Sequence, residues 1–311
     1  MKKLLSFILA VALCLSLLAA LSSCGKKTDY TVGICQLMKH DALDAATKGF
    51  EDALKAKMEA AGKTVEIITE VPGEATLCPT VINTFVSKNV NLIMANATPA
   101  LLSAANATKT IPILGTSVTS YSDTFENGVP SNVSGTSDGV SFEDQAQMMI
   151  DTLGLAENDQ VGVIYCSNES NSVLQYNKVK DYFETKGIIV KAYTFSETTE
   201  LQTVAASAVS ESDAIYVPSD NTVSANEKVL DSVASAAKKP VFTSYGGDIC
   251  YASLAIDYYQ LGYKTGEMAA DVLLGNKTIA DLGNPDNNIL TPTTQYNKTR
   301  CEALGIPVPE N

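Results

Sequence analysis

Histidine and arginine, which often carry acid–base chemistry and anion binding, occur once each in this chain, as His40 and Arg300. A Ser-His-Asp or Cys-His enzyme would have to use His40, and a guanidinium clamp on a phosphate could use only Arg300. Zinc sites rich in histidine are excluded by count, although cysteine ligands are not. The motifs H-E-x-x-H and G-x-x-x-x-G-K and the Rossmann glycine triplet do not occur. We therefore expect a chain that is not an enzyme and uses no metal or cofactor.

Seven cysteines are the other reactive side chains, and no two of them form a C-x-x-C pair. Cys14 and Cys24 belong to an N-terminal segment that is treated below. The other five cannot all pair, whereas exported proteins usually hold cysteine in disulfides. We expect free, mostly buried thiols, although the sequence does not exclude one disulfide bridge. The five are Cys35, Cys78, Cys166, Cys250 and Cys301.

The first residues read as an export signal rather than as part of a fold. Two lysines precede an apolar run over residues 4–21, and the tetrapeptide Leu-Ser-Ser-Cys that ends at Cys24 resembles the lipobox of bacterial lipoproteins. The alternative is a permanent membrane anchor with an ordinary buried cysteine. We expect residues 1–23 to be a lipoprotein signal peptide, Cys24 to carry lipid, and residues 24–29 to tether the chain outside the cell membrane.

The charge balance limits the possible partners. Acidic residues outnumber basic ones by 35 to 22, for a formal net charge of −13. A protein that binds the phosphate backbone needs a basic face, so nucleic acid is not an expected partner. Hydrophobic residues make up 45% of the 311 residues, which is a globular composition. This length suffices for about two domains.

Beyond Asp29 the chain alternates short β-branched apolar runs with segments of helical period. In the first half we expect strands at 30–37, 65–71, 91–97 and 111–115, helices at 41–61, 76–87 and from Pro99, and a loop-rich stretch at 116–139. In the second half we expect strands at 160–165, 188–195, 214–218, 240–244 and 252–257, and helices at 142–153, 172–186, 200–210, 224–237 and 258–274. Strands separated by such helices form parallel sheets covered on both faces. The two series predict two α/β, Rossmann-like lobes with a ligand cleft at the carboxyl ends of their strands.

Six segments carry a family resemblance through their order and spacing. They are GICQLMKHDALD at 33–44, ATPA at 97–100, NVSGTSD at 132–138, VGVIYCSNESNS at 161–172, YVPSDNT at 216–222 and IDYYQLG at 256–262. Together they resemble the tryptophan- and tyrosine-type substrate-binding lipoproteins of ABC transporters, a branch of the type I periplasmic binding proteins. The resemblance runs from about Tyr30 to Ile306. The chain departs from the family at Lys39 and Asp41, where Glu and Pro are usual, and at 244–251, where a Gly-Glu-rich loop is usual.

The resemblance implies two lobes that exchange chain through a three-crossover hinge. We place the crossovers near Asp138, within 245–251 and near Leu290. Lobe one then comprises 28–138 plus 250–284, and lobe two comprises 139–249 plus 285–311. The hinge would let the lobes close on a ligand.

An amino acid held in such a cleft needs donors for its carboxylate and acceptors for its ammonium. The candidate donors follow strands and precede helices, where the helix dipole also favours an anion. They are Thr98, Thr116, Ser117, Ser170 and Asn171, with Ser172 beside them. Helix capping is the competing interpretation for Thr98 and Ser172.

The candidate acceptors for the ammonium also lie at strand ends. They are Asp220, with Asn221 beside it, and Asp257, each of which could instead form a turn or a helix cap. Gln36 ends the first strand and is expected to face the same cleft. Tyr121, Tyr165 and Tyr245 could stack on an aromatic ligand. For His40 we favour a solvated loop position, and for the pair Tyr258–Tyr259 we favour packing.

The resemblance implies an extracytoplasmic, lipid-anchored and monomeric protein that delivers an amino acid to an ABC permease. An aromatic or other apolar amino acid is the expected ligand. A nucleoside- or sugar-binding protein of the same fold is the alternative, and the absence of tryptophan weakens the sugar option slightly. A sensor that passes the bound state to a receptor is a further alternative.

Overall fold

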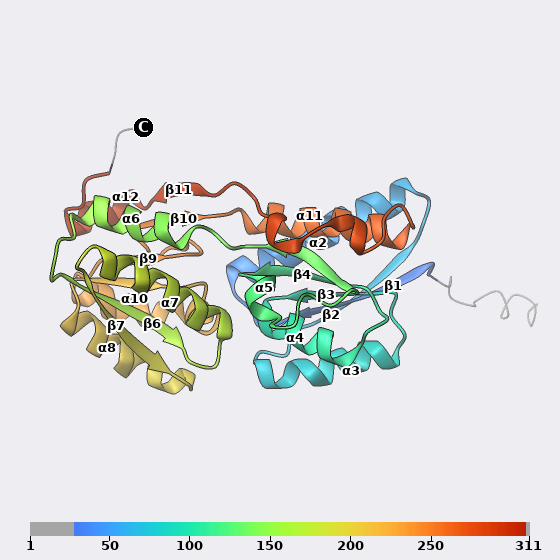
Figure 1. Cartoon of the computed structure of the whole chain (residues 1–311), viewed down its shortest axis with the longest axis horizontal. Helices are drawn as coiled ribbons and strands as arrows, with labels where there is room; N and C mark the ends of the chain where they lie inside the picture. Colours follow the sequence, from blue (N-terminus) through green and yellow to red (C-terminus); the bar gives the residue numbers. More distant parts are fainter. Residues whose placement is uncertain (1–27, 309–311) are drawn as a thin grey trace, which may run out of the picture.

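The computed structural model describes residues 28–308, which form two α/β lobes side by side (Figure 1). The expected signal peptide and Cys24 lie outside the described residues. Within the described range, no helix combines the length and apolar character needed to span a bilayer.

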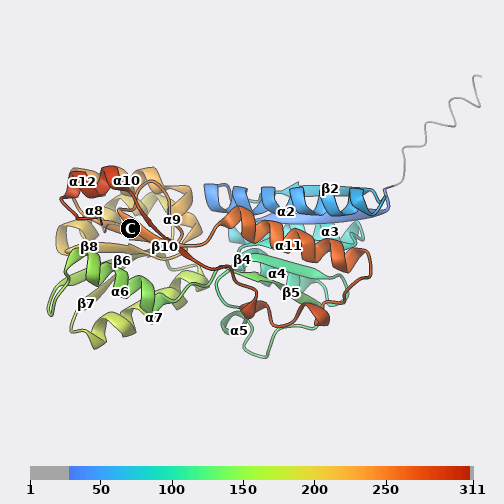
Figure 2. The same cartoon turned by 90° about the horizontal axis from the view of Figure 1, so that it is seen from above.

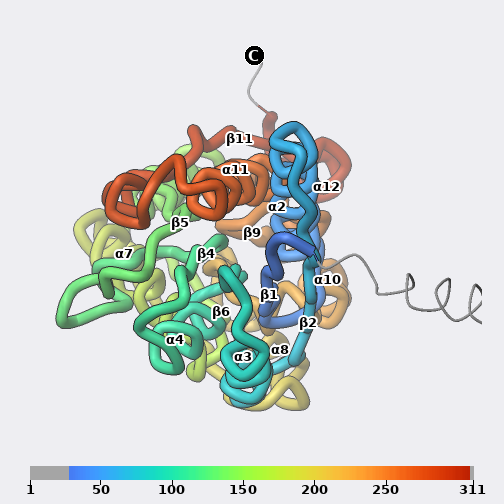
Figure 3. The backbone as a smooth tube through the Cα atoms, turned by 90° about the vertical axis from the view of Figure 1, so that its right-hand side faces the viewer, coloured from blue at the N-terminus to red at the C-terminus, as the bar shows by residue number. Residues whose placement is uncertain are grey.

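Lobe one is built on a parallel sheet of five strands in the order β2-β1-β3-β4-β5. The strands are β1 (Tyr30–Gln36), β2 (Val65–Glu70), β3 (Leu92–Asn96), β4 (Ile113–Val118) and β5 (Val133–Ser137). Helices α2 (Asp41–Ala60) and α11 (Tyr258–Leu273) cover one face, and α3 (Cys78–Ser87) and α4 (Thr98–Ala107) cover the other, as Figure 3 shows along the long axis. Alternate side chains of a strand point to opposite faces, so Ile34 packs under α2 whereas Cys35 packs under α3.

Lobe two is built on a sheet of six strands in the order β11-β10-β9-β8-β6-β7, in which only β11 runs antiparallel to its neighbour. The strands are β6 (Gln160–Cys166), β7 (Ile189–Phe195), β8 (Ala214–Val217), β9 (Val241–Thr243), β10 (Ala252–Ala255) and β11 (Thr293–Tyr296). One face is covered by α6 (Phe142–Leu153), α7 (Ser170–Thr185) and α12 (Lys298–Leu304), and the other by α8 (Leu201–Glu211), α9 (Asn221–Ala225) and α10 (Glu227–Ala236). Arg300 bonds Asp231 at 2.6 Å and the Asp248 carbonyl at 2.7 Å, so the single guanidinium braces this lobe.

Helices α2 and α11 run side by side, as Figure 2 shows, and glycines allow their close approach. A Cβ atom on Gly262 would lie 1.8 Å from the Ala46 carbonyl oxygen, and one on Gly49 would lie 2.0 Å from the Tyr259 carbonyl oxygen. Neither position can carry a larger side chain unless the helices separate. The α2–α11 pair thus joins the two separate chain segments that form lobe one.

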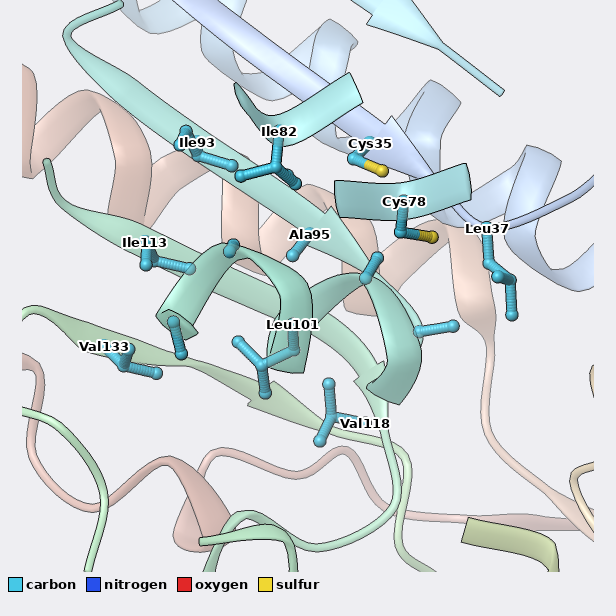
Figure 4. Packing of buried hydrophobic residues seen from close by; sticks show 14 of the residues in the cluster. Cys35, Leu37, Cys78, Ile82, Ile93, Ala95, Leu101, Ile113, Val118 and Val133 are labelled. Carbon is cyan, nitrogen blue, oxygen red and sulfur yellow. The ribbon is translucent and has the colours of Figure 1, made fainter. Parts of the chain in front are cut away.

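The five cysteines of the described chain are free and buried, as expected. Figure 4 shows Cys35 on β1 and Cys78 on α3 among the apolar side chains between the lobe-one sheet and its helices α3 and α4. Cys166 and Cys301 lie in the lobe-two cores. Cys166 and Cys301 each belong to a cluster of buried apolar side chains, so their thiols pack as small core residues.

Two of the expected lobe boundaries are wrong. Strand β10 pairs with β9, so residues 250–255 belong to lobe two, and the chain crosses over only after Ala255. The 3-10 turn η4 (Pro285–Asn287) stays on lobe one, where Asp286 accepts from the Tyr121 backbone N–H at 2.6 Å. Lobe one therefore comprises 28–138 plus about 257–290, and lobe two about 139–256 plus 291–308.

The short elements were the ones missed. Strand β5 and helix α5 (Tyr121–Thr124) lie inside the stretch expected to be loop, and neither β11 nor α12 was expected. The β5 sequence Val-Ser-Gly-Thr-Ser has only one apolar residue, yet all five residues are buried between β4 and α11. Thr136 on β5 shares a hydrogen bond of 2.7 Å with Thr265 on α11, which replaces apolar contact with a buried polar one. The remaining 3-10 turns are η1 (Ala75–Leu77), η2 (Thr198–Glu200) and η3 (Ala280–Leu282).

Candidate functional site between the lobes

A small, partly open cavity of about 20 Å³ lies between the lobes, at the carboxyl ends of strands from both sheets. Lobe one supplies loops after β1, β4 and β5 and the start of α11, and lobe two supplies loops after β6, β8 and β9. The lining residues are His40, Ala42, Leu43, Ser117, Thr119, Asp138 and Tyr258 from lobe one, and Asn171, Ser219, Asp220, Asn221, Ser224 and Tyr245 from lobe two. This volume is far smaller than the roughly 300–1,000 Å³ that is typical of small-molecule sites. A wider, open groove of about 810 Å³ lies beside it and shares the residues His40, Ala42, Ser224, Tyr245 and Tyr258 with it.

Unpartnered polar atoms converge on this cavity. Among the described residues, eight buried side-chain polar atoms have no hydrogen-bond partner, and five of them belong to cavity residues. These five are His40 Nδ1, Ser117 Oγ, Asp138 Oδ1, Asn171 Oδ1 and Tyr245 OH. Each buried polar group without a partner costs about 1–3 kcal/mol, so a cluster of five is expected where a polar ligand completes the bonds.

Asp138 is the carboxylate best placed to meet a cation. It follows β5 at the first crossover and is 8% exposed. One oxygen accepts from the Tyr258 hydroxyl at 2.9 Å, and the other, Oδ1, has no partner. Burial raises the pKa of Asp138 from 3.8 to about 6, because no positive charge offsets its desolvation. A ligand ammonium at Oδ1 would supply that charge.

Ser117 carries a conformational cost that points to the same site. Its backbone φ is 54°, in the left-handed region that side-chain-bearing residues rarely adopt. The pairing of β4 with β5 shifts register between Gly115 and Val118, and such irregularities re-aim a side chain. The result is a buried hydroxyl in the cavity wall without a partner. Strain of this kind concentrates at functional positions.

Two hydrogen bonds cross from lobe to lobe at the cavity. His40 Nε2 of lobe one lies 3.3 Å from Asn221 Oδ1 of lobe two. Gln175 of lobe two donates to the Thr119 hydroxyl of lobe one at 3.1 Å. Burial lowers the pKa of His40, which favours the neutral imidazole. The two bonds connect the lobes in this closed arrangement.

Five of the eleven candidate ligand residues line the cavity, namely Ser117, Asn171, Asp220, Asn221 and Tyr245. Both Asp220 oxygens are already engaged, one with Val223 N–H at 2.8 Å as the cap of α9 and one with Cys166 N–H at 2.7 Å. Asp257 is exposed, caps α11 through Gln260 N–H at 3.0 Å, and faces the wider groove rather than the cavity.

The other five candidates are placed away from the cavity lining. Gln36 bonds Asp44 and Thr47, and Thr116 bonds Thr136 at 3.2 Å. Thr98 is buried at the start of α4, and Ser170 is exposed at the start of α7. Tyr165 stacks on Tyr176 with ring centroids 5.1 Å apart, inside the lobe-two core.

The structure corrects the sequence-based expectation for several cavity residues. His40, expected to be a solvated loop residue, lies in the cavity wall, as does Tyr258, which was assigned to packing. Asp138 was considered only as a hinge position. Tyr121, proposed to stack on a ligand, is fully buried in lobe one, and its hydroxyl donates to the Thr136 carbonyl at 3.2 Å. The signal that could have found Asp138 is its position directly after a strand at the lobe junction.

Residues 135–139 read Gly-Thr-Ser-Asp-Gly and so match the G-x-S-x-G pattern of hydrolase nucleophiles. Ser137 is the last residue of β5, and its hydroxyl donates to the Thr119 carbonyl at 2.9 Å and accepts from Gly139 N–H at 3.0 Å. The single histidine of the chain bonds Asn221 instead. The match therefore lacks the serine–histidine contact that activates such a nucleophile.

Comparison with known proteins agrees with this geometry. A family model for ABC transporter substrate binding proteins matches residues 31–311. The chain belongs to this family. Such substrate-binding proteins act outside the cytoplasm, and their fold is that of the type I periplasmic binding proteins.

Named relatives of this substrate-binding protein are similar over nearly the whole chain. A tyrosine-binding protein of Clostridioides difficile is 35% identical over 304 residues, which cover 90% of this chain and 86% of the relative. The ABC domain in complex with L-Trp from Streptococcus pneumoniae is 29% identical with a TM-score of 0.78, covering 89% of this chain and 96% of that one.

A third relative, from Clostridium difficile, was solved as a ligand-free, open structure of a substrate-binding protein with adhesive properties. It is 31% identical, covers 91% of this chain and 97% of its own, and has a TM-score of 0.67. At nearly equal identity, this substrate-binding protein thus resembles the L-Trp complex more than the open structure.

Proposed function

We propose that this substrate-binding protein captures an aromatic amino acid outside the cytoplasmic membrane and delivers it, as a monomer, to an ABC permease. The observation that carries the proposal is the set of five unpartnered polar atoms that converge on the cavity between the lobes, which adjoins a groove of about 810 Å³. The relatives that are named for tyrosine binding or contain L-Trp support an aromatic side chain.

The charged ends of the ligand would be divided between two kinds of groups. Asp138 Oδ1 accepts from the ammonium, and Asn171 Oδ1 adds a second acceptor, since the Asn171 amide N–H donates to the Ser219 carbonyl at 2.7 Å. The hydroxyls of Ser117 and Tyr245 donate to the carboxylate. Asp138 thus takes the role that the sequence assigned to Asp220 or Asp257.

A thermal-shift screen of the mature chain tests this proposal against its alternatives. Amino acids, nucleosides and sugars would be compared at matched concentrations. A ligand at 100 times its Kd stabilises the folded state by about 2.7 kcal/mol, which is readily detected. We expect the largest shifts with aromatic amino acids. A shift of the unfolding temperature with nucleosides or sugars alone would show that the ligand is not an amino acid.

We propose that binding leaves the ligand chemically unchanged. Ser137 has no histidine contact, and the buried hydroxyls of the cavity have no basic partner among the described residues. Ligand recovered after long incubation should have an unaltered mass. Recovery of a converted product would show that the site is catalytic.

We propose that the chain is exported as a lipoprotein with lipid on Cys24. The variant Cys24→Ala should accumulate as unprocessed precursor without lipid label, because the thiol that receives the lipid is absent. Cys14→Ala, which changes a cysteine within the same apolar run, is the matched control and should be processed normally. Normal processing and labelling of Cys24→Ala would refute the lipoprotein assignment.

A further inference from the structure

His40 lines the cavity, and the carboxylate of Glu169 determines the tautomer of its ring through Asn221. Glu169 is 4% exposed and follows β6 in lobe two. Its Oε2 accepts from the Asn221 backbone N–H at 2.9 Å and from Asn221 Nδ2 at 2.6 Å. Its Oε1 accepts from the Thr222 backbone N–H at 2.8 Å and from the Thr222 hydroxyl at 2.7 Å.

These bonds determine which way the Asn221 amide points. A carboxylate oxygen with two N–H groups beside it is an acceptor, so the Asn221 amide must turn its NH₂ group toward Glu169. The Asn221 carbonyl oxygen Oδ1 then faces away from Glu169 and lies 3.3 Å from His40 Nε2. Glu169 is therefore a positioning residue for an amide that meets lobe one.

The orientation of Asn221 in turn determines the tautomer of His40. Because Asn221 Oδ1 can only accept, His40 Nε2 must carry the proton and donate. In the neutral imidazole the other nitrogen, Nδ1, is then an acceptor. His40 Nδ1 is buried without a partner, and His40 lines the cavity. The site thus offers a third acceptor besides Asp138 Oδ1 and Asn171 Oδ1.

His40 follows β1 and Asp138 follows β5, with β3 and β4 between these strands in the sheet order, so the two acceptors enter the cavity from different parts of lobe one. With the ligand ammonium on Asp138, another part of the same ligand would supply the donor for His40 Nδ1. In an amino acid that part is the side chain.

We propose that His40, held in the Nε2–H tautomer by Asn221 and Glu169, selects aromatic amino acids whose side chain carries an O–H or N–H donor over those whose side chain has none. This inference rests on the proposed function and deepens it. Phenylalanine would leave His40 Nδ1 unpaired. That loss corresponds to roughly a 10- to 100-fold lower affinity than for a matched ligand with a donor.

Calorimetry with four ligands of nearly equal shape tests the selection. Tyrosine and 4-aminophenylalanine carry a donor at the ring, whereas phenylalanine and 4-fluorophenylalanine do not. The wild-type chain should bind the first two at least about tenfold more tightly. His40→Phe should reduce that ratio to within about twofold, whereas His40→Gln, whose amide keeps both an N–H toward Asn221 and an oxygen acceptor, should retain part of it.

Glu169→Gln tests the positioning role. The glutamine amide can donate as well as accept, which allows the Asn221 amide group to rotate by half a turn. We therefore expect a smaller ratio of tyrosine affinity to phenylalanine affinity. The matched control is Glu200→Gln, since Glu200 also accepts backbone N–H groups, from Ser196 and Glu197, but does not bond a cavity residue. It should leave the ratio unchanged. A tyrosine-to-phenylalanine ratio that persists in His40→Phe would overturn the proposal.

The tautomer can be measured separately, because an untagged chain contains one histidine. A ¹⁵N–¹H correlation spectrum of that imidazole should show a protonated Nε2 and an unprotonated Nδ1 at neutral pH. A protonated Nδ1 would overturn the proposal. If neither the four ligands nor L-tryptophan binds the wild-type chain, the proposed function fails, whereas the spectrum still tests the His40 arrangement.

Discussion

Replacing Asp138 by asparagine should separate the affinity of the protein from its stability. The substitution keeps the size of the side chain and an oxygen that can accept from Tyr258, and it removes the charge. We expect Asp138→Asn to weaken amino acid binding strongly while the empty protein becomes no less stable.

The magnitudes follow from the burial of the carboxylate. The rise in the pKa of Asp138 from 3.8 in the unfolded chain to about 6 in the folded one means that its ionised form opposes folding above pH 6. That rise corresponds to roughly 3 kcal/mol of unfolding free energy at pH 7, which Asp138→Asn would recover in part. Breaking a buried ion pair by removing one partner costs about 3–5 kcal/mol, so the affinity should fall at least ~100-fold.

Two measurements on the same samples decide this prediction. Calorimetry gives the affinity for tyrosine, and thermal unfolding gives the midpoint with and without ligand. Asp138→Asn should unfold at or above the wild-type midpoint when empty and show little upward shift with ligand. Asp257→Asn is the control, since this exposed carboxylate caps α11 and should leave the affinity within about twofold. A wild-type affinity in Asp138→Asn would show that the ammonium binds elsewhere.

Three further predictions concern pH, capping and helix packing. Tyrosine affinity should be constant near pH 7 and fall toward tenfold per pH unit below about pH 6, because Asp138 must lose a proton to bind the ammonium; calorimetry at pH 7.5 and 5.0 checks this, and the decline should be absent in Asp138→Asn. Asp220→Ala should lower the unfolding free energy by roughly 2–4 kcal/mol in urea titrations, since the Val223 and Cys166 N–H groups lose their acceptor. Gly262→Ala should cost roughly 3 kcal/mol in the same assay, because its Cβ would meet the carbonyl of the facing helix, and an unchanged midpoint would contradict the close approach.

The fold was predictable because its signals are local and repeated. Runs such as Leu92–Asn96 are short, apolar and fully buried, and helices of regular period separate them. Strand β5 was not predicted because its residues are mostly Ser, Thr and Gly, whose burial depends on partners such as Thr265 far along the chain. The crossover after β10 was misplaced for a similar reason, since only pairing with β9 assigns that strand to lobe two.

The site was predictable in location but less so in chemistry. The position of polar residues at strand ends identified Ser117, Asn171 and Asn221, because the carboxyl ends of parallel strands meet at one edge of the sheet. The sequence could not distinguish a carboxylate that is used up in capping, such as Asp220, from one that is left unpaired, such as Asp138. That distinction depends on which backbone N–H groups the fold brings near, and it appears only in three dimensions.

Calorimetry of free L-tyrosine against N-acetyl-L-tyrosine with the mature chain tests the central claim most directly. Acetylation removes the positive charge that Asp138 is proposed to meet and leaves the aromatic side chain and the carboxylate in place. We predict that free tyrosine binds and that the acetylated form binds at least ~100-fold more weakly. Equal affinities for the two would contradict a buried ammonium site at Asp138 and with it the proposal that this cavity holds an amino acid.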